Sequence, residues 1–345
     1  MIIDINMHAL PEKLFEDEAM LESYLRIVPC SYGEFAKLTT IPGTDIKQIV
    51  IEKPKGCENL NFSLNNIDSK ARLEIMEKAG LDKAILRTPC WQEWLTLDMC
   101  KQVNDNMAKI LKQNPGRFYA VAAVPPWGDK GCIDELERCI NDLGFIGVEL
   151  AAHYGNKYLD DDIFRPYFRR LNELNVPIVV HHTPLPVEYG SLYEYTNMRR
   201  SIGRCIDQLI AVNREIFSGL FDECPNLKMI HSMLGGAFFA FTNQIALRKS
   251  GVKEEIERFD SAALKVRNYL ENNLFFGITT PLAWSRAQLE CAVKEMGAEH
   301  ILYGSSYPVM LDWVLNGVDY VRSLNISDKE KELIFSGNAQ RLFNI

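Results

Sequence analysis

The sequence predicts an α/β fold, and more specifically a closed (β/α)8 TIM barrel. Eight short apolar runs recur along the chain, longer amphipathic stretches follow them, and turn signals such as "NPGR" at 114–117 separate the two kinds of segment. Runs that are apolar throughout are typical of parallel strands covered on both faces. Eight β-α units in succession match the number that closes a barrel. The alternative is an open doubly wound sheet, but neither G-x-G-x-x-G nor G-x-x-x-x-G-K-[ST] occurs.

The strands and helices alternate along nearly the whole chain. The predicted strands are 1–5, 83–87, 118–124, 147–151, 177–182, 227–232, 274–278 and 300–304. The predicted helices are 68–80, 97–113, 130–143, 161–175, 199–222, 253–272 and 285–297, and two more follow residue 308. We therefore expect one domain, 1–345, with its functional groups at the carboxyl ends of the strands.

One long segment interrupts this alternation. Residues 12–66 join the first strand to the first helix, and connections of this length are usually functional, often as lids. Within it, "IKQIVIEK" (46–53) is predicted to be a strand of a small sheet. We expect the segment to be a lid-like insertion over the barrel mouth, together with a second stretch at 183–197.

Composition limits the classes of partner. The chain has 345 residues, of which 47% are hydrophobic, and a formal net charge of -8, which is ordinary for a globular protein with a sizeable core. Its basic residues are dispersed, so we expect no nucleic acid and no membrane as a partner. The nine cysteines form no C-x-x-C pair and are expected to be reduced thiols of a cytoplasmic protein. Neither a leader segment nor an 18-residue apolar run is evident.

Histidines gather at the predicted carboxyl ends of the strands. His8, His153 and His181 follow strands, and His231 lies within the sixth strand. Several histidines on one rim of a barrel indicate an active site. His231 is predicted to point into the barrel one layer deeper, as a base, a metal ligand or a hydrogen-bonded core residue. His182 points away from His181 if the strand is regular, or reaches the pocket if the strand ends there.

Several motifs occur in order at intervals that resemble those of the amidohydrolase-2 family of the amidohydrolase superfamily. They are "DINMHALP" (4–11), "GRFYAVAAVPP" (116–126), "VPIVVHH" (176–182), "SGLFDECPNLKMI" (218–230), "LGGAFF" (234–239), "YGSSYP" (303–308) and "GNAQRLF" (337–343). This branch includes aminocarboxymuconate-semialdehyde decarboxylase and related aromatic-acid decarboxylases. The resemblance implies a TIM barrel, a decarboxylase or hydrolase acting on a small carboxylic acid, and a homodimer.

The resemblance also implies a divalent metal ion, commonly zinc, held at four positions. Here those positions are occupied by Asn6, His8, His181 and Ser306, and the family's proton-carrying histidine is replaced by Met233. Asparagine and serine offer neutral oxygens, which are poor zinc ligands. We therefore expect a degenerate site, with either no tightly bound metal or zinc held atypically by His8 and His181.

The candidate site residues fall into two groups. The predicted catalytic residues are His8, His181 and His231. The predicted substrate-binding residues are Asn6, Arg87, Trp91, His182, Met233 and Ser306. An arginine fork binds a carboxylate through two hydrogen bonds, and aromatic side chains suit a planar ligand.

Three hypotheses about activity remain open at this point. The first is a lyase or hydrolase that uses histidine acid–base catalysis without a tightly bound metal. The second is a metal-dependent lyase with a rebuilt ligand set, His8 and His181 with His231 or Glu149. The third is a non-catalytic binding protein, or a partner subunit, that keeps the barrel.

Overall fold

The strands of the computed structural model follow one another in chain order around a closed barrel. They are β1 (Ile3–His8), β5 (Lys83–Arg87), β6 (Phe118–Ala120), β7 (Ala122–Ala123), β8 (Val148–Ala151), β11 (Ile178–His181), β12 (Met229–His231), β13 (Leu274–Gly277) and β14 (Ile301–Leu302). Neighbouring strands are parallel, and β6 and β7 are two parts of one strand on either side of Val121. The barrel closes where the Ile5 N–H donates to Tyr303 O at 3.1 Å and the His8 N–H donates to Tyr307 O at 2.8 Å. The predicted barrel is confirmed, and the open sheet is not.

The structure describes residues 1–28, 33, 35–52, 58–63, 69–89, 92–183, 186–188, 190–192, 198–245 and 262–345. Within these ranges the predicted strands and helices match the structure to within a few residues at their ends. The first part of the predicted helix 253–272 lies outside the described residues.

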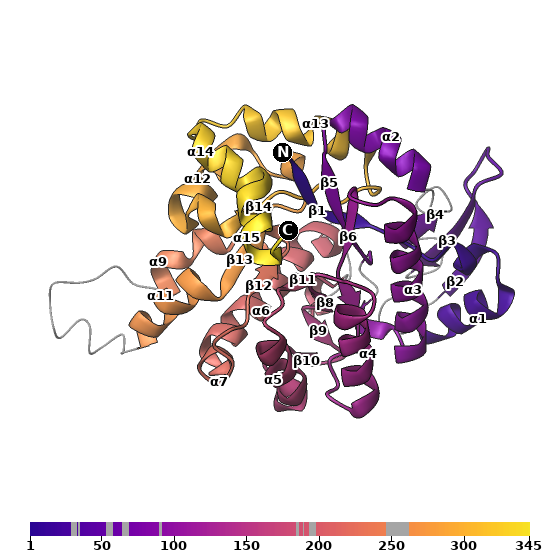
Figure 1. Cartoon of the computed structure of the whole chain (residues 1–345), viewed down its shortest axis with the longest axis horizontal. Coiled ribbons are helices and arrows are strands. Elements are labelled where there is room, and N and C mark those ends of the chain that lie inside the picture. Colours follow the sequence, from indigo (N-terminus) through magenta and orange to yellow (C-terminus); the bar gives the residue numbers. More distant parts are fainter. Residues whose placement is uncertain are drawn as a thin grey trace, which may run out of the picture.

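Helices surround the strands (Figure 1). They are α2 (Ser69–Ala79), α3 (Leu97–Gln113), α4 (Lys130–Asn141), α5 (Arg165–Leu174), α6 (Arg204–Phe217), α7 (Leu220–Glu223), α8 (Met233–Ala237), α9 (Thr242–Ile245), α11 (Ala262–Asn272), α12 (Arg286–Met296), α13 (Leu311–Arg322), α14 (Asp328–Glu332) and α15 (Asn338–Phe343). Side-chain caps fix several starts: Thr96 accepts from the Met99 N–H, and Ser285 forms a capping box with Gln288.

The barrel interior is apolar through most of its depth. Successive strands contribute one inward-facing apolar layer, formed by Ile3, Ile5, Ile85, Val121, Val179, Ile230, Phe275 and Leu302. Ala339 and Phe343 of α15 join this layer. The Asn338 amide of the same helix donates to Ile301 O at the start of β14, so α15 closes the amino end of the barrel. Polar interior groups therefore lie toward the carboxyl end.

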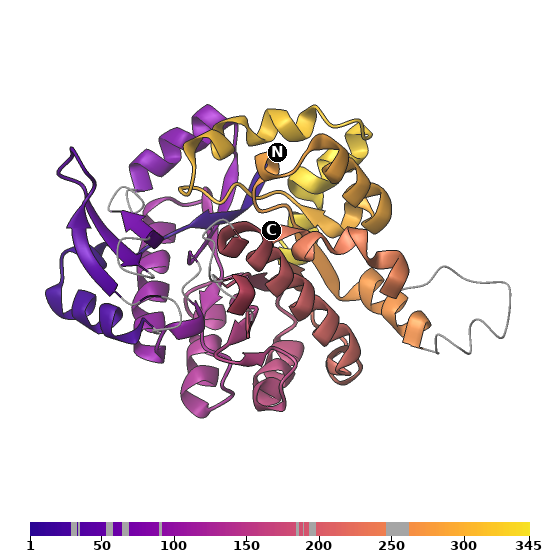
Figure 2. The ribbon, with the colours of Figure 1, turned by 180° about the vertical axis from the view of Figure 1, so that it is seen from behind.

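The segment after β1 forms a small unit of its own. It contains a 3-10 helix (Glu12–Phe15), α1 (Glu18–Ile27) and an antiparallel sheet of β2 (Phe35–Thr40), β3 (Lys47–Glu52) and β4 (Glu58–Ser63) in that order. The strand predicted within 46–53 is confirmed as β3. Figures 1 and 2 place this sheet beyond the carboxyl end of β1, next to α1. Ile49 and Ile51 are buried in one hydrophobic cluster with barrel residues. That the segment covers the barrel mouth stays a prediction, and much of 183–197 lies outside the described residues.

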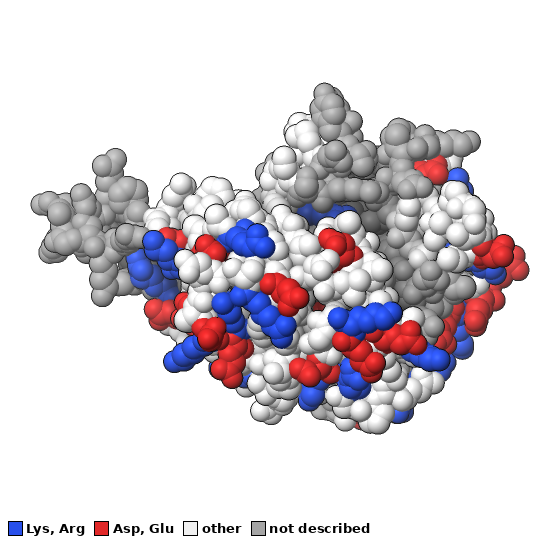
Figure 3. Space-filling view, turned by 90° about the horizontal axis from the view of Figure 1, so that it is seen from above, with Lys and Arg blue, Asp and Glu red and all other residues white. Residues whose placement is uncertain are grey.

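The described surface and thiols are those of an ordinary globular chain. Among the described residues, no helix combines the length and apolar character needed to cross a membrane. Blue and red side chains are intermixed on the face shown in Figure 3. The described cysteines that are free thiols are Cys100, Cys132, Cys139, Cys205, Cys224 and Cys291.

Candidate active site

The carboxyl end of β1 is held against the loop that follows β14. β1 shifts register after Asp4, and this irregularity lets both Ile5 and Asn6 line the barrel interior. The buried Asp4 carboxylate accepts the N–H of Asn6 at 2.8 Å, the N–H of Ser305 at 3.0 Å and the Ser305 hydroxyl. Asp4 therefore fixes the two segments that carry Asn6 and Ser306.

Asn6 and Ser306 contact each other directly. The Asn6 Nδ2 donates to Ser306 Oγ at 2.5 Å, and both residues are buried. Ser306 adopts a left-handed backbone conformation with φ 57°, which turns its hydroxyl toward β1. Asn6 Oδ1 is buried and has no hydrogen-bond partner among the described residues. This carbonyl oxygen is available to accept a hydrogen bond from a ligand.

His8 and His181 lie side by side at the mouth of the barrel. Their ring centroids are 5.8 Å apart in an edge-to-face arrangement. Both ring nitrogens of His8 are buried without a hydrogen-bond partner in the described part of the chain. His181 Nδ1 is 2.7 Å from His182 O. Because a carbonyl oxygen can only accept, Nδ1 carries the proton and Nε2 is the basic nitrogen of His181.

His182 lies beside His181, where the strand has already ended. The two ring centroids are 4.1 Å apart. His182 Nδ1 is 3.2 Å from Ser232 Oγ, and the same oxygen accepts the His182 N–H at 3.0 Å. The strand ends at His181, and the irregular backbone after it keeps His182 at the mouth. This is the second predicted alternative, in which His182 reaches the pocket because the strand ends there.

Arg87 and Glu149 form an ion pair inside the barrel. Arg87 ends β5, its Cα is paired with that of His8, and it is 1% exposed. Arg87 Nε donates to Glu149 Oε1 at 2.5 Å. Glu149 Oε2 accepts the Thr88 N–H at 2.8 Å and the Thr88 hydroxyl at 2.6 Å. These contacts satisfy both carboxylate oxygens and hold the guanidinium in one orientation.

Burial and positive charge keep the histidines at the mouth neutral. The pKa of His8 is lowered to about 3, chiefly by desolvation and also by the nearby charges of Arg87, Arg72 and Arg204. Burial likewise depresses the pKa values of His181 and His182. The site therefore presents neutral imidazoles next to fixed cations, which favours an anionic ligand.

The prediction that His231 points into the barrel is wrong. Its neighbours Ile230 and Ser232 line the interior, and alternation along a strand directs His231 to the opposite face. There its Nε2 is 2.8 Å from Glu215 Oε2 and its Nδ1 is 3.1 Å from Gln208 Oε1, both on α6. His231 therefore connects β12 to the helical layer and does not reach the other histidines.

Met233 and Trp91 complete the set of predicted site residues. Met233 is half-buried, and its backbone N–H donates to Thr279 Oγ1 at 2.7 Å. Trp91 lies outside the described residues. The sequence reasoning missed Thr279 and Ser232, which line the same interior space as Arg87. Once Ile230 is known to face inward, alternation along the strand places Ser232 on the same face, but the sequence alone does not set that phase.

The donor set does not fit a tightly bound divalent metal. The four positions hold two imidazoles, one amide and one hydroxyl, none of them anionic, and the Asn6 amide is already bonded to Ser306. Among the described residues, no three His, Cys, Asp or Glu side chains are arranged to hold a metal ion. The rebuilt ligand set is contradicted as well, since His231 contacts α6 and Glu149 is bonded to Arg87. An arginine beside the position further disfavours a second cation.

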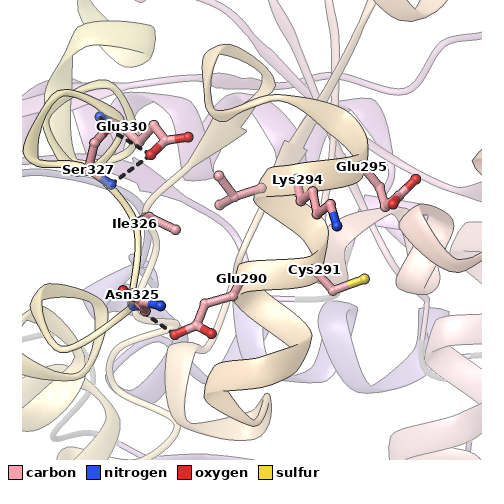
Figure 4. Close-up of a pocket in the computed structure, with 9 residues that line it drawn as sticks. Glu290, Cys291, Lys294, Glu295, Asn325, Ile326, Ser327 and Glu330 are labelled. Carbon is pink, nitrogen blue, oxygen red and sulfur yellow. Dashed lines mark hydrogen bonds between the residues drawn. The ribbon is translucent and has the colours of Figure 1, made fainter.

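A wider hollow lies on the outer helical layer, between α12 and α14. Figure 4 shows residues of both helices and of the segment between α13 and α14 around it, and its lining is Glu290, Cys291, Val293, Lys294, Glu295, Asn325, Ile326, Ser327 and Glu330. Glu290 accepts the Asn325 N–H at 2.7 Å, and Glu330 accepts the N–H of Ser327, which is the N-cap of α14. These carboxylates stabilise local helix packing, and the candidate site residues lie at the barrel mouth instead.

Comparison with known proteins identifies the family. The amidohydrolase family model (Amidohydro_2) matches residues 92–345. The chain belongs to the amidohydrolase family. It is 29% identical over 289 residues to γ-resorcylate decarboxylase from a Rhizobium species. The match covers 79% of this chain and 86% of that protein. It is 26% identical over 280 residues to 2-amino-3-carboxymuconate-6-semialdehyde decarboxylase from Dictyostelium discoideum, covering 79% and 75% of the two chains.

A solved amidohydrolase structure shares the fold over the whole chain. It is 5-carboxyvanillate decarboxylase from Novosphingobium aromaticivorans, complexed with manganese and 4-hydroxy-3-methoxy-5-nitrobenzoic acid. Its TM-score is 0.76 at 21% identity, and the match covers 100% of this chain and 96% of that one. At this identity the likeness shows the shared fold.

Proposed function

We propose that the protein is a decarboxylase of an aromatic carboxylic acid that works without a tightly bound metal. In the reaction, the bond between the ring carbon and the carboxylate breaks, carbon dioxide leaves, and the ring carbon takes up one proton. The observation that carries the proposal is the convergence of His8, His181 and Arg87 at the mouth of an amidohydrolase barrel. The decarboxylase relatives support the choice of reaction.

His8 is the proposed proton donor to the ring carbon. Its two ring nitrogens have no partner among the described residues, so either can face a ligand. It is neutral in the free protein because burial and nearby arginines lower its pKa. A bound carboxylate offsets part of that positive charge, which raises the pKa of His8 and lets it take up the proton that the reaction consumes.

Asn6, Ser306 and His181 are proposed to orient the substrate. The Asn6 carbonyl oxygen accepts a hydrogen bond from a ring hydroxyl, and Ser306 holds the amide in that orientation. The imidazole of His181, beside His8, is a proposed contact of the ring. Trp91 and Met233 remain proposed substrate contacts, as they were from the sequence.

The proposal is tested by supplying aromatic acids to chelator-treated protein and measuring product. We expect wild-type protein to convert at least one ortho-hydroxylated benzoate, with release of carbon dioxide. His8→Gln should lower the rate by roughly 100-fold or more, the usual contribution of a positioned acid, while retaining ligand affinity. Binding without turnover by wild-type protein would instead favour the non-catalytic binding protein.

Three further predictions concern the setting in which this activity operates. We propose a homodimer, a cytoplasmic location with reduced thiols, and a lid role for residues 12–66. The free cysteines of the described chain support the second, and the place of Ile49 and Ile51 in the same hydrophobic cluster as barrel residues supports the third. Light scattering and limited proteolysis with and without an aromatic acid test the first and third.

A further inference from the structure

The interior of the barrel mouth contains a cation that is fixed in place before any ligand binds. Arg87 is 1% exposed, and Glu149 orients it through the contact between Arg87 Nε and Glu149 Oε1. The second oxygen of Glu149 is occupied by the backbone and hydroxyl of Thr88. Because the carboxylate is fully engaged on both sides, the guanidinium has little freedom to rotate.

One terminal nitrogen of this guanidinium lacks a partner among the described residues. Arg87 Nη2 is buried and has no hydrogen-bond partner among the described residues. Arg87 lines the interior space that Asn6, Ser232 and Thr279 also line. A buried N–H without a partner is costly, and a charged one more so. Such a group inside a pocket indicates a ligand that accepts hydrogen bonds.

The charges around this space favour an anionic acceptor. Arg72 Nη2 donates to His8 O at 2.9 Å, so a second guanidinium lies next to the site. Arg87, Arg72 and Arg204 all oppose protonation of His8. Glu149 offsets one of these charges, and its oxygens already have partners within the barrel.

We propose that Arg87 binds the carboxylate of the aromatic acid and supplies the positive charge of this site in place of a divalent ion. The space bounded by Arg87 and Asn6 has about 190 Å³ of empty volume and leaves no room for a water-sized group, so a ligand has to push the surrounding side chains apart. We place the carboxylate beside Arg87 and the ring toward His8 and His181, nearer the mouth. The choice of an aromatic acid rests on the proposed function.

Paired ligands test this assignment directly. Titration calorimetry in the presence of a chelator compares 2,6-dihydroxybenzoate with resorcinol, which has the same ring without the carboxylate. Wild-type protein should bind the acid more tightly. Arg87→Met combined with Glu149→Gln, which leaves no unpaired carboxylate, should weaken binding of the acid about 10- to 100-fold and leave resorcinol affinity unchanged. Arg87→Lys keeps the charge but loses the fork, so acid affinity should fall to an intermediate value.

Arg165→Met is the matched control. Arg165 is also a buried arginine, 8% exposed, and its Nη1 contacts Glu223 at 3.3 Å, but it belongs to the outer helical layer. This variant should bind both ligands as wild type does. If the acid and resorcinol weaken equally in the Arg87 variants, if acid affinity does not change, or if wild type binds neither ligand, the assignment is overturned. Binding is measured without turnover, so an inactive protein that still needs Arg87 for the acid would contradict only the proposed reaction.

Discussion

At the scale of single residues, the hydrogen bond between Asn6 and Ser306 defines this barrel mouth. It joins the ends of β1 and β14 with two neutral side chains at 2.5 Å. A metal ion held by carboxylate or imidazole groups would require different donors at both positions. The consequence is that the two strand ends are held together without an ion.

Restoring ionisable donors should therefore create a metal site. We expect the combined variant Asn6→His and Ser306→Asp to bind about one Mn²⁺ or Zn²⁺ per chain, because the new side chains complete a four-donor set with His8 and His181. Mass spectrometry of dialysed protein measures the metal content. Adding Arg87→Met should tighten binding, since a competing cation is removed. Asn6→Gln with Ser306→Asn adds no such donors and serves as the control; equal metal in that control would contradict the expectation.

The neutral state of His8 predicts a pH dependence of stability. The pKa of His8 is about 3 in the folded protein against 6.5 ordinarily, so the unfolded chain binds the extra proton between these values. The contribution of His8 to the free energy of unfolding is therefore fully present above pH 6.5. It is lost as the pH falls toward 3. In urea titrations across this window, His8→Asn should flatten the dependence by up to about 1.4 kcal/mol per pH unit. Parallel curves for the two proteins would show that His8 does not carry this effect.

At the scale of elements, β12 is anchored to α6 through a buried pair. His231 and Glu215 are both nearly unexposed, and burial raises the pKa of Glu215 while His231 opposes that shift. His231→Leu leaves the carboxylate unpaired and should lower the free energy of unfolding by about 3–5 kcal/mol. Adding Glu215→Leu should recover part of that loss. Turnover by the folded variants should persist; a variant of full stability and no turnover would restore the catalytic role that the sequence suggested.

The element α8 that follows β12 is a left-handed turn that contains two glycines. Five consecutive residues, 233–237, have positive φ, and a Cβ on Gly236 would lie 1.8 Å from Cys205 O of α6. Gly236→Ala should therefore lower the melting temperature and shift α6. Gly144→Ala is the control, because Gly144 also has a positive φ of 71° but no atom within 4 Å of the added carbon. Equal effects in both variants would assign the loss to backbone strain alone.

The sequence was a good guide to elements and a weaker one to side-chain direction. Apolar runs located β5 at its observed residues, because a strand covered on both faces leaves a strong compositional signal. The direction of His231 was missed because such a strand is apolar on both faces, so its alternation cannot be phased from composition. Arg87 was found as a carboxylate-binding candidate, but its pairing with Glu149 joins residues 62 apart in the chain. Contacts of this kind depend on the barrel register, which no local pattern contains.

At the scale of the whole molecule, the barrel separates an apolar amino end from a polar carboxyl end. Phe343 and Ala339 close the first, and the inward layer of branched and aromatic side chains fills the middle. Charged groups such as Arg87 and Glu149 are held at the opposite end, where they are paired yet near the entrance. This division places the proposed chemistry where a ligand can enter without disrupting the core.

The most direct test of the account measures metal content and decarboxylation on the same chelator-treated preparation. With 2,6-dihydroxybenzoate and related aromatic acids, we predict product formation at a rate that does not change when Mn²⁺ or Zn²⁺ is added, from protein that contains far less than one metal ion per chain. A rate that rises in proportion to bound metal, and disappears when the metal is removed, would contradict the central claim that Arg87 and neutral histidines perform this reaction without an ion.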